Sequence, residues 1–227
     1  MSLSFWVVTN TIKGVTHLLC SVNAEQIRKV PAHGPLILIC NHINFLDAPL
    51  VFSHLQPRLV TGFAKVETWD NPWMAALFDL WGGIPIRRGE ADSVALRAGL
   101  EALKRGKILA ITPEGTRSGD GCLLQGHPGV VMLALHSGAP LLPLAYWGNE
   151  RFHSNLRRLR RTPFQVSVGQ PFHLDDHGER VTHTVRQAMT DEIMCQLAAL
   201  LPPEYHGFYA RKQPTTTYLR FLDSKRI

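Results

Sequence analysis

Short runs of apolar residues recur along the chain and alternate with segments of helical spacing. Such runs, bounded by turn residues, are typical of buried strands. They predict strands at 36–40, 58–63, 84–86, 107–112, 141–146 and 164–168. Between them, Ser93 is the predicted N-cap of a helix ending at Gly106, and further helices are predicted over 129–136, with Gly138 as C-cap, and over about 179–201. This alternation predicts an α/β fold with a mixed, largely parallel central sheet flanked by helices.

The first twenty residues carry a separate amphipathic pattern. Phe5, Val8, Ile12, Val15 and Leu19 follow one another at steps of three and four, as the apolar face of a helix does. An ordinary helix packed on the domain and a helix lying among lipid head groups both fit this stripe. We expect an amphipathic, membrane-associating segment over 1–25 and one domain over 26–227.

A second apolar segment, 73–81, has a tryptophan at each end. Most such segments belong to a core, but two flanking tryptophans also suit a membrane interface or an acyl-chain groove. No stretch approaches the roughly 20 consecutive apolar residues that a membrane-spanning helix needs, so no such helix is expected.

Composition narrows the class of protein. With 227 residues, 45% hydrophobic and 19% charged, the chain is not disordered, collagen-like or a disulfide scaffold. Its 24 Lys and Arg, 17 of them Arg, exceed 18 Asp and Glu, which indicates an anionic partner such as nucleic acid, lipid head groups or a phosphorylated substrate. The four cysteines are too widely spaced for a metal cluster and suit a reducing compartment.

Two polar loops directly follow predicted strands, where α/β sheets bind ligands. In the first, His42 and Asp47 are five residues apart and do not share a helical face, but a turn at the helix start Asp47-Ala48-Pro49 would bring them together. Asp47 would then accept a hydrogen bond from the imidazole and leave the other nitrogen as a general base. Spacing alone leaves open that Asp47 only caps the helix and His42 is a loop residue.

The second loop, 113–118, combines a glycine with phosphate-binding side chains. Gly115 allows close approach of the backbone, Arg117 can bind phosphate through two hydrogen bonds, and Thr116 can donate another. Arg87 and Arg88 follow the predicted strand 84–86. Each arginine considered alone also fits a solvated surface position.

Taken together, these segments resemble the PlsC-like glycerophospholipid acyltransferases, the lysophosphatidic acid acyltransferase family. Its motifs are matched in order by Asn41, His42 and Asp47 (Asn-His-x4-Asp, the HX4D motif), by 82–88 (Gly-x-Ile-x-Ile-x-Arg), by 113–118 (Pro-Glu-Gly-Thr-Arg-Ser), by a proline-containing strand at 139–144 and by Tyr-x-Gly-x-Tyr at 205–209. The chain departs from the family at Asn44, where serine is common, and at 125–128, which replaces a Phe-Lys pattern.

The resemblance implies an O-acyltransferase that moves a fatty acyl group from acyl-coenzyme A or acyl carrier protein to the free hydroxyl of a lysophospholipid. The expected acceptor is 1-acyl-sn-glycerol-3-phosphate and the product phosphatidic acid, with His42 as general base and Asp47 orienting it. The implied substrate-binding residues are Lys65, Arg88, Glu114, Gly115, Thr116 and Arg117. No metal or cofactor is expected beyond the acyl donor itself.

The expected partners are the lysophospholipid acceptor, the acyl donor and an anionic membrane surface, with the protein peripheral on the cytoplasmic face. The basic run 157–161 suits such a surface, and no nucleic-acid motif is present. Alternatives are a glycerol-3-phosphate or other lysolipid acceptor, a transacylase with a phospholipid donor, a hydrolase in which His42 activates water, and a non-catalytic lysolipid-binding protein. Phosphate binding alone needs no base, which disfavours the last of these. Oligomeric state is left open.

Overall fold

The computed structural model describes residues 2–90 and 92–223. Positions 1, 91 and 224–227, which the predicted segment and domain include, lie outside the described residues. The helices are α1 (Leu3–Leu19), α2 (Ala24–Ile27), α3 (Asp47–Leu55), α4 (Pro72–Leu80), α5 (Ser93–Lys104), α6 (Gly129–Ser137), α7 (Phe152–Arg157) and α8 (His183–Ala198). The strands are β1 (Cys20–Val22), β2 (Leu36–Cys40), β3 (Val60–Lys65), β4 (Ile84–Ile86), β5 (Ile108–Ile111), β6 (Leu141–Trp147), β7 (Thr162–Val168), β8 (Phe172–Leu174) and β9 (Leu219–Phe221). Short 3-10 helices cover Val66–Asp70, Asn149–Arg151, Pro203–Tyr205 and Gly207–Tyr209.

The strands form one mixed sheet in the order β1-β7-β6-β2-β5-β3-β4, with β8 beside β6 and β9 beside β8. Strand β2 lies at the centre and is parallel to both neighbours, so that Leu38 is level with Ala110 of β5 and Leu142 of β6. The pairs β3–β5 and β3–β4 are also parallel, whereas β6–β7, β6–β8 and β8–β9 are antiparallel. The predicted mixed, largely parallel sheet is therefore confirmed.

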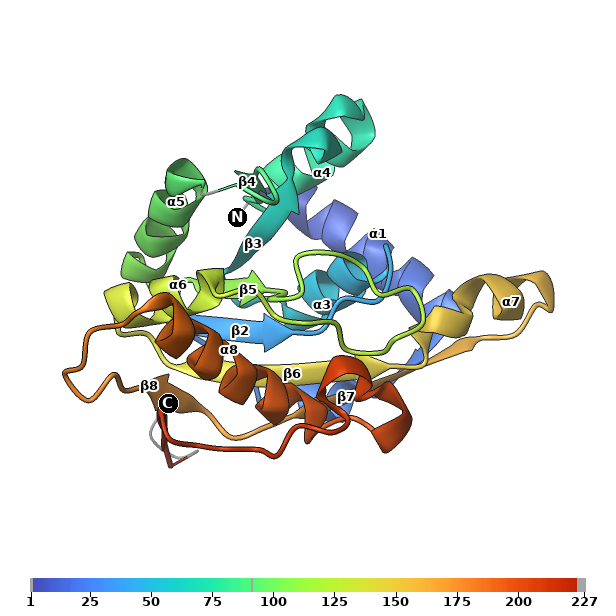
Figure 1. The fold of residues 1–227 in the computed structure, drawn as a ribbon. Helices are drawn as coiled ribbons and strands as arrows, with labels where there is room; N and C mark the ends of the chain where they lie inside the picture. The colour runs from blue at the N-terminus through green and yellow to red at the C-terminus, as the bar shows by residue number, and fades with distance from the viewer. Residues whose placement is uncertain (1, 91, 224–227) are drawn as a thin grey trace.

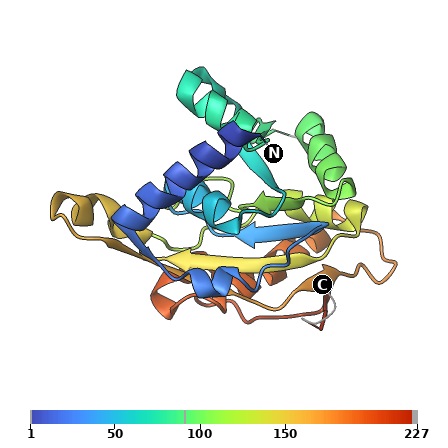
Figure 2. The same cartoon turned by 180° about the vertical axis from the view of Figure 1, so that it is seen from behind.

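Helices cover both faces of this sheet, which explains why β2 is apolar at every position. Because side chains alternate along a strand, Ile37 and Ile39 enter one core with α5, α6 and α8, while Leu36 and Leu38 enter a second core with α1 and α3. Figures 1 and 2 show the two layers from opposite sides, with α8 in front of the sheet in one view and α1 in front in the other.

Helix α1 packs on the domain through only part of the predicted stripe. Phe5 is buried and Ile12 and Leu19 pack against the second core, but Val8 and Val15 are exposed. Threonines complete the inward face, where Thr9 accepts a hydrogen bond from Trp81 Nε1 at 3.2 Å. The helix therefore lies along α3, as Figure 2 shows, and turns a second apolar face outward.

Several element boundaries differ from the predicted ones. Asp92, not Ser93, caps α5, because its Oδ1 accepts the backbone N–H groups of Val94 and Ala95. Helix α8 begins later than predicted because Thr182 caps it. The three-residue strands β1, β8 and β9 were not predicted, because each has a polar residue in the middle and so forms no apolar run, unlike the equally short β4.

Candidate active site

The two loops that contain the predicted site residues, 41–47 and 113–118, leave the same edge of the sheet, because they follow the parallel neighbours β2 and β5. Their backbones are hydrogen-bonded to each other: Ser118 N donates to His42 O at 2.9 Å and Gly119 N donates to Ile43 O at 3.0 Å. Residues 76 positions apart in sequence are thus joined into one unit. The two loops therefore lie side by side at the carboxyl ends of parallel neighbours, where α/β sheets bind ligands.

Within this unit, His42 Nδ1 lies 2.7 Å from Asp47 Oδ2. The same oxygen accepts the backbone N–H groups of Ile43 at 2.7 Å and Asn44 at 3.0 Å, which closes the turn before α3. Asp47 caps nothing forward in α3, whose N-cap is Leu46, so the capping alternative does not describe it. Because a carboxylate oxygen only accepts, Nδ1 carries the proton and Nε2 has the free lone pair.

Glu114 holds the loop of His42 and Asp47 from the β5 side. Its Oε1 accepts the backbone N–H of His42 at 2.7 Å and its Oε2 accepts that of Leu124 at 2.9 Å. The side chain is only 2% exposed, and burial, its largest influence, raises the pKa of Glu114 to about 7. Glu114, which is expected to bind the acceptor, thus joins two loops through its two carboxyl oxygens.

The Tyr-x-Gly-x-Tyr segment at 205–209 is hydrogen-bonded to Leu123, the neighbour of the Leu124 that Glu114 binds. Leu123 N donates to Tyr205 O and Phe208 N donates to Leu123 O, both at 2.9 Å. Gly207 has φ +48°, and an added Cβ would lie 2.3 Å from Leu123 O, so the close approach requires glycine. The segment therefore has a structural task next to Glu114.

Asn41 fixes the end of β2 to β6. Its side-chain amide donates to Tyr146 O at 2.8 Å and accepts from Tyr146 N at 2.9 Å, which reproduces a strand-like pairing. The Tyr146 hydroxyl also donates to Asn41 O. Asn41, the first residue of the Asn-His-x4-Asp motif, thus positions the loop by fixing its start to β6.

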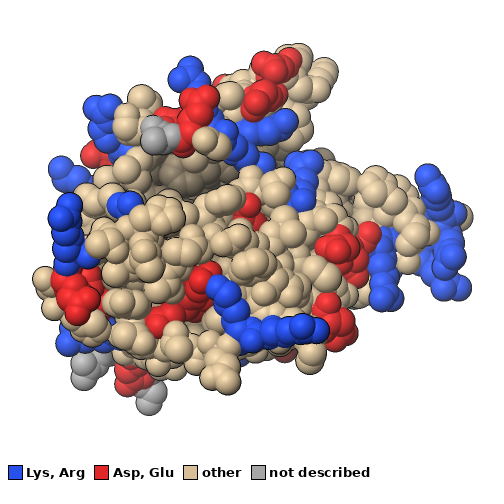
Figure 3. Space-filling model, viewed as in Figure 1, with Lys and Arg blue, Asp and Glu red and all other residues tan. Residues whose placement is uncertain are grey.

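Three basic side chains stand at the ends of neighbouring strands: Lys65 is the last residue of β3, Arg88 follows β4, and Arg117 lies in the loop after β5. All three are exposed, and among the described residues none forms an ion pair. The pKa of Arg88 is lowered by burial and then by the positive charge of Arg117, while Glu67 opposes this. In Figure 3, basic side chains border the recess between the α4–β4 region and the body of the sheet.

The remaining predicted residues lie in the same loop as Arg117. Gly115 has φ +67°, and His127 lies against it, so that an added Cβ would be 3.1 Å from His127 Cδ2. Thr116 is exposed beside Arg117. The loop therefore presents glycine, hydroxyl and guanidinium groups on the side of the sheet edge where His42 lies.

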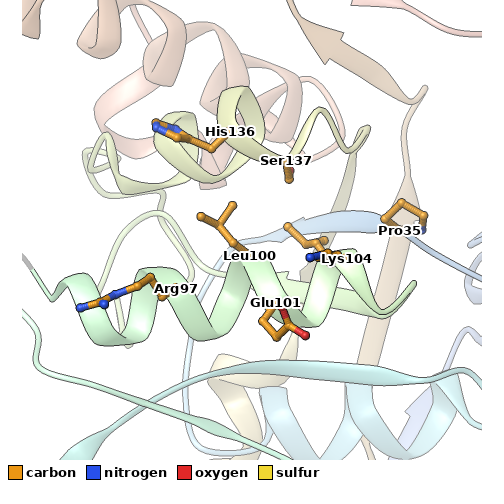
Figure 4. A pocket seen from close by; sticks show the side chains of 8 residues that line it. Pro35, Arg97, Leu100, Glu101, Lys104, His136 and Ser137 are labelled. Carbon is orange, nitrogen blue, oxygen red and sulfur yellow. The ribbon is translucent and has the colours of Figure 1, made fainter.

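A hollow of about 620 Å³ between α5 and α6 contains none of the predicted site residues. Figure 4 shows its lining side chains on the two helices, among them Arg97, Lys104 and His136. A smaller one of about 220 Å³ lies beside the start of α1. We place the active site at His42 because an acid–base pair and unpaired basic groups converge there, which neither hollow offers.

Comparison with known proteins identifies the family of this chain. The family model described as Acyltransferase matches residues 21–147, more than half of the chain, and spans both loops. The chain belongs to this family. The predicted enzyme class, an O-acyltransferase, is confirmed. Among the described residues, no helix has both the length and the apolar character needed to cross a bilayer.

Three proteins of known name are similar in sequence to this chain. The 1-acyl-sn-glycerol-3-phosphate acyltransferase of Bacillus subtilis is 24% identical over 184 residues, covering 81% of this chain and 90% of its own. The enzyme of the same name from Limnanthes alba is 34% identical over 62% of this chain, which spans about half of that relative. The lyso-ornithine lipid O-acyltransferase of Pseudomonas aeruginosa is 34% identical over 49% of this chain and 42% of its own length.

One solved structure has the same fold. The crystal structure of the 1-acyl-sn-glycerophosphate (LPA) acyltransferase PlsC from Thermotoga maritima matches with a TM-score of 0.63 and 23% identity. The match covers 86% of this chain and 78% of that one. The two proteins therefore share a fold.

Sequence reasoning did not single out Asn149, which lies beside Asp47 in the structure. The only signal in the sequence is its position directly after the predicted strand 141–146, next to the strand that carries His42. Asn44, where the chain departs from the family pattern, is bonded to both Asp47 and Asn149.

Proposed function

We propose that this acyltransferase moves a fatty acyl group from acyl-coenzyme A or acyl carrier protein to the free hydroxyl of 1-acyl-sn-glycerol-3-phosphate, giving phosphatidic acid. The observation that carries the proposal is the 2.7 Å contact of His42 Nδ1 with Asp47 in a loop bordered by unpaired basic groups. The names of the relatives from Bacillus subtilis and Limnanthes alba support this acceptor.

His42 acts as the general base of the transfer. Its Nε2 takes the proton of the acceptor hydroxyl as the oxygen attacks the thioester carbonyl, because a neutral alcohol is a weak nucleophile. Asp47 accepts from Nδ1 throughout and balances the charge of the imidazolium. When the tetrahedral intermediate collapses, the C–S bond breaks and the proton on Nε2 passes to the leaving thiolate.

The acceptor's phosphate binds to Arg88 and Arg117, with Lys65 and Thr116 at its border and Gly115 allowing close approach. Two guanidinium groups near enough for one to lower the pKa of the other are stabilised when an anion lies between them. Glu114 supports the site from behind through the backbone of His42.

The test is an acyl-transfer assay with each donor and a panel of acceptors, including glycerol-3-phosphate and lyso-ornithine lipid. We expect His42→Ala to lower kcat by about 10²- to 10⁴-fold, while His33→Ala, in an exposed loop, retains activity. Arg88→Ala and Arg117→Ala should raise KM for the acceptor more than KM for the donor. Full activity of a folded His42→Ala protein, or release of free fatty acid without acceptor, would contradict the proposal.

We infer further that the enzyme is peripheral on an anionic membrane and contacts it through α1, α4 and α7. Apolar side chains project outward from each: Leu18 on α1 is 73% exposed, Trp73 on α4 is 83% exposed, and Leu159 in the turn after α7 is 95% exposed. Figures 1 and 2 place the three helices along one side of the molecule, and basic side chains gather over α7 in Figure 3. Apolar contact and attraction to anionic head groups would act together there.

Sedimentation with phosphatidylglycerol vesicles tests this surface. A variant carrying Leu3→Ser, Val7→Ser and Leu18→Ser should bind about 10-fold more weakly or worse, and salt should weaken binding by the native protein. The control is Val94→Ser, which alters an equally exposed apolar residue on α5. Unchanged binding by the triple variant would refute the role of α1.

A further inference from the structure

Asn149 is buried directly behind the acid–base pair. It follows β6 after Gly148, is 0% exposed, and belongs to the 3-10 helix Asn149–Arg151. Its Nδ2 donates to Asp47 Oδ1 at 2.7 Å and to Asn44 Oδ1 at 3.2 Å. The Asn44 amide in turn donates to Asn149 O at 2.8 Å, so the two asparagines hold each other.

The backbone leaves this arrangement little freedom. Gly148 has φ +96°, and an added Cβ would lie 2.5 Å from Pro163 O, so the turn is pressed against β7. Asn149 therefore reaches Asp47 from a fixed point at the end of β6. Its own Oδ1 accepts no hydrogen bond from any described residue, a cost that an apolar side chain would avoid.

The two oxygens of Asp47 have different partners. Oδ2 accepts from His42, Ile43 and Asn44, whereas Asn149 is the donor recorded for Oδ1. Rotation about the Cβ–Cγ bond would move both oxygens of Asp47. The donor on Oδ1 therefore adds a restraint from the opposite side of the carboxylate to the three donors on Oδ2, and helps to keep Oδ2 in line with His42 Nδ1.

We propose that Asn149, held by Asn44, is a positioning residue of the acyltransferase: it fixes Asp47, and through it the imidazole ring of His42, in the orientation that directs Nε2 at the acceptor hydroxyl. This inference rests on the proposed function. It also explains Asn44, whose side-chain amide orients Asn149 and whose backbone N–H donates to Asp47 Oδ2.

Two variants of Asn149 distinguish loss of its hydrogen-bond donor from a change in the shape of its side chain. Asn149→Leu has a similar size and no donor, and it should lower kcat about 10- to 100-fold with little change in either KM, because misplacing a catalytic group acts on the chemical step. Asn149→Asp has the same shape but offers an acceptor to the Asp47 carboxylate, so its loss should be at least as large. Asn155→Leu is the matched control, since Asn155 bonds Thr162 and not Asp47.

A second readout needs no acceptor. The proton on His42 Nδ1, bonded to a carboxylate, should give a low-field resonance in the proton NMR spectrum that is lost in His42→Gln. We expect this resonance to shift or broaden in Asn149→Leu and to stay in place in Asn155→Leu.

The outcomes distinguish the two proposals. If the native protein acylates no lysophospholipid, the proposed function fails, and the NMR comparison still decides the role of Asn149. The positioning role is overturned if the resonance is unchanged in folded Asn149→Leu, or if Asn149→Asp is as active as the native enzyme.

Discussion

The buried carboxyl of Glu114 makes a quantitative prediction about stability and pH. Burial raises its pKa to about 7 from the ordinary value of 4.5. The folded protein then holds this proton over a range of pH in which the unfolded chain has released it. The contribution of Glu114 to stability is therefore present below pH 4.5 and is lost as pH rises through 7.

The size of the effect follows from the two pKa values. One unit corresponds to about 1.4 kcal/mol, so the contribution of Glu114 should be about 2.5 kcal/mol larger at pH 5 than at pH 8. Glu114→Gln has the same shape and cannot titrate. The free energy of unfolding of the native protein, minus that of Glu114→Gln, should thus be about 2.5 kcal/mol greater at pH 5.

Urea unfolding followed by tryptophan fluorescence measures this difference at the two pH values. Taking the difference between the two proteins cancels the titration of all other groups. Glu101→Gln is the control, because Glu101 is exposed on α5 and paired with Arg105, so its effect should change by less than about 1 kcal/mol. An equal difference at pH 5 and pH 8 would refute the reasoning, since the carboxyl would then titrate alike in the folded and unfolded chains.

Three further changes test the packing around the site. His54 is buried between α1 and α3, and burial lowers its pKa to about 4, so the stability of the protein should fall as pH drops from 6.5 through 4. Acid unfolding followed by circular dichroism should therefore occur at lower pH in His54→Gln. An unchanged midpoint would contradict this. Leu103→Ala, in the core under α5, should cost about 2–5 kcal/mol in urea unfolding, and a loss below 1 kcal/mol would indicate a site that collapses. Gly207→Ala should lower the melting temperature and kcat together, because its Cβ would displace Leu123 from the loop that Glu114 holds; melting like the native protein would show that the loop adapts.

The strands that stand out most clearly in the sequence are β2 and β6, whose residues are apolar throughout. Strands β1, β8 and β9 have three residues each, with a polar residue in the middle, and only pairing with their neighbours makes them strands. The stripe on α1 predicted a helix but not the face that packs, because Thr9 points inward to a hydrogen bond with Trp81. Hydrophobic periodicity identifies apolar positions only, so it does not predict a buried pair of hydrogen-bonded polar groups.

The candidate site was predicted where chemistry depends on residues close in sequence. The turn from His42 to Asp47 is one such case, and the phosphate-binding character of 113–118 is another. The task of Glu114 was not predictable, because its partners His42 and Leu124 are set by the pairing of β2 with β5 and by a distant loop. Asn149, more than a hundred residues from Asp47, is joined to it only by the pairing of β2 with β6.

The central place of β2 explains how a short loop becomes a precise catalytic element. Its neighbour β5 supplies Glu114, which holds the backbone of His42, and its neighbour β6 leads to Asn149, which holds the carboxylate of Asp47. A loop at the edge of the sheet would have only one such neighbour. The residues that hold the loop are buried and the basic residues are exposed, so substitutions in the first group should act on kcat and those in the second on KM for the acceptor.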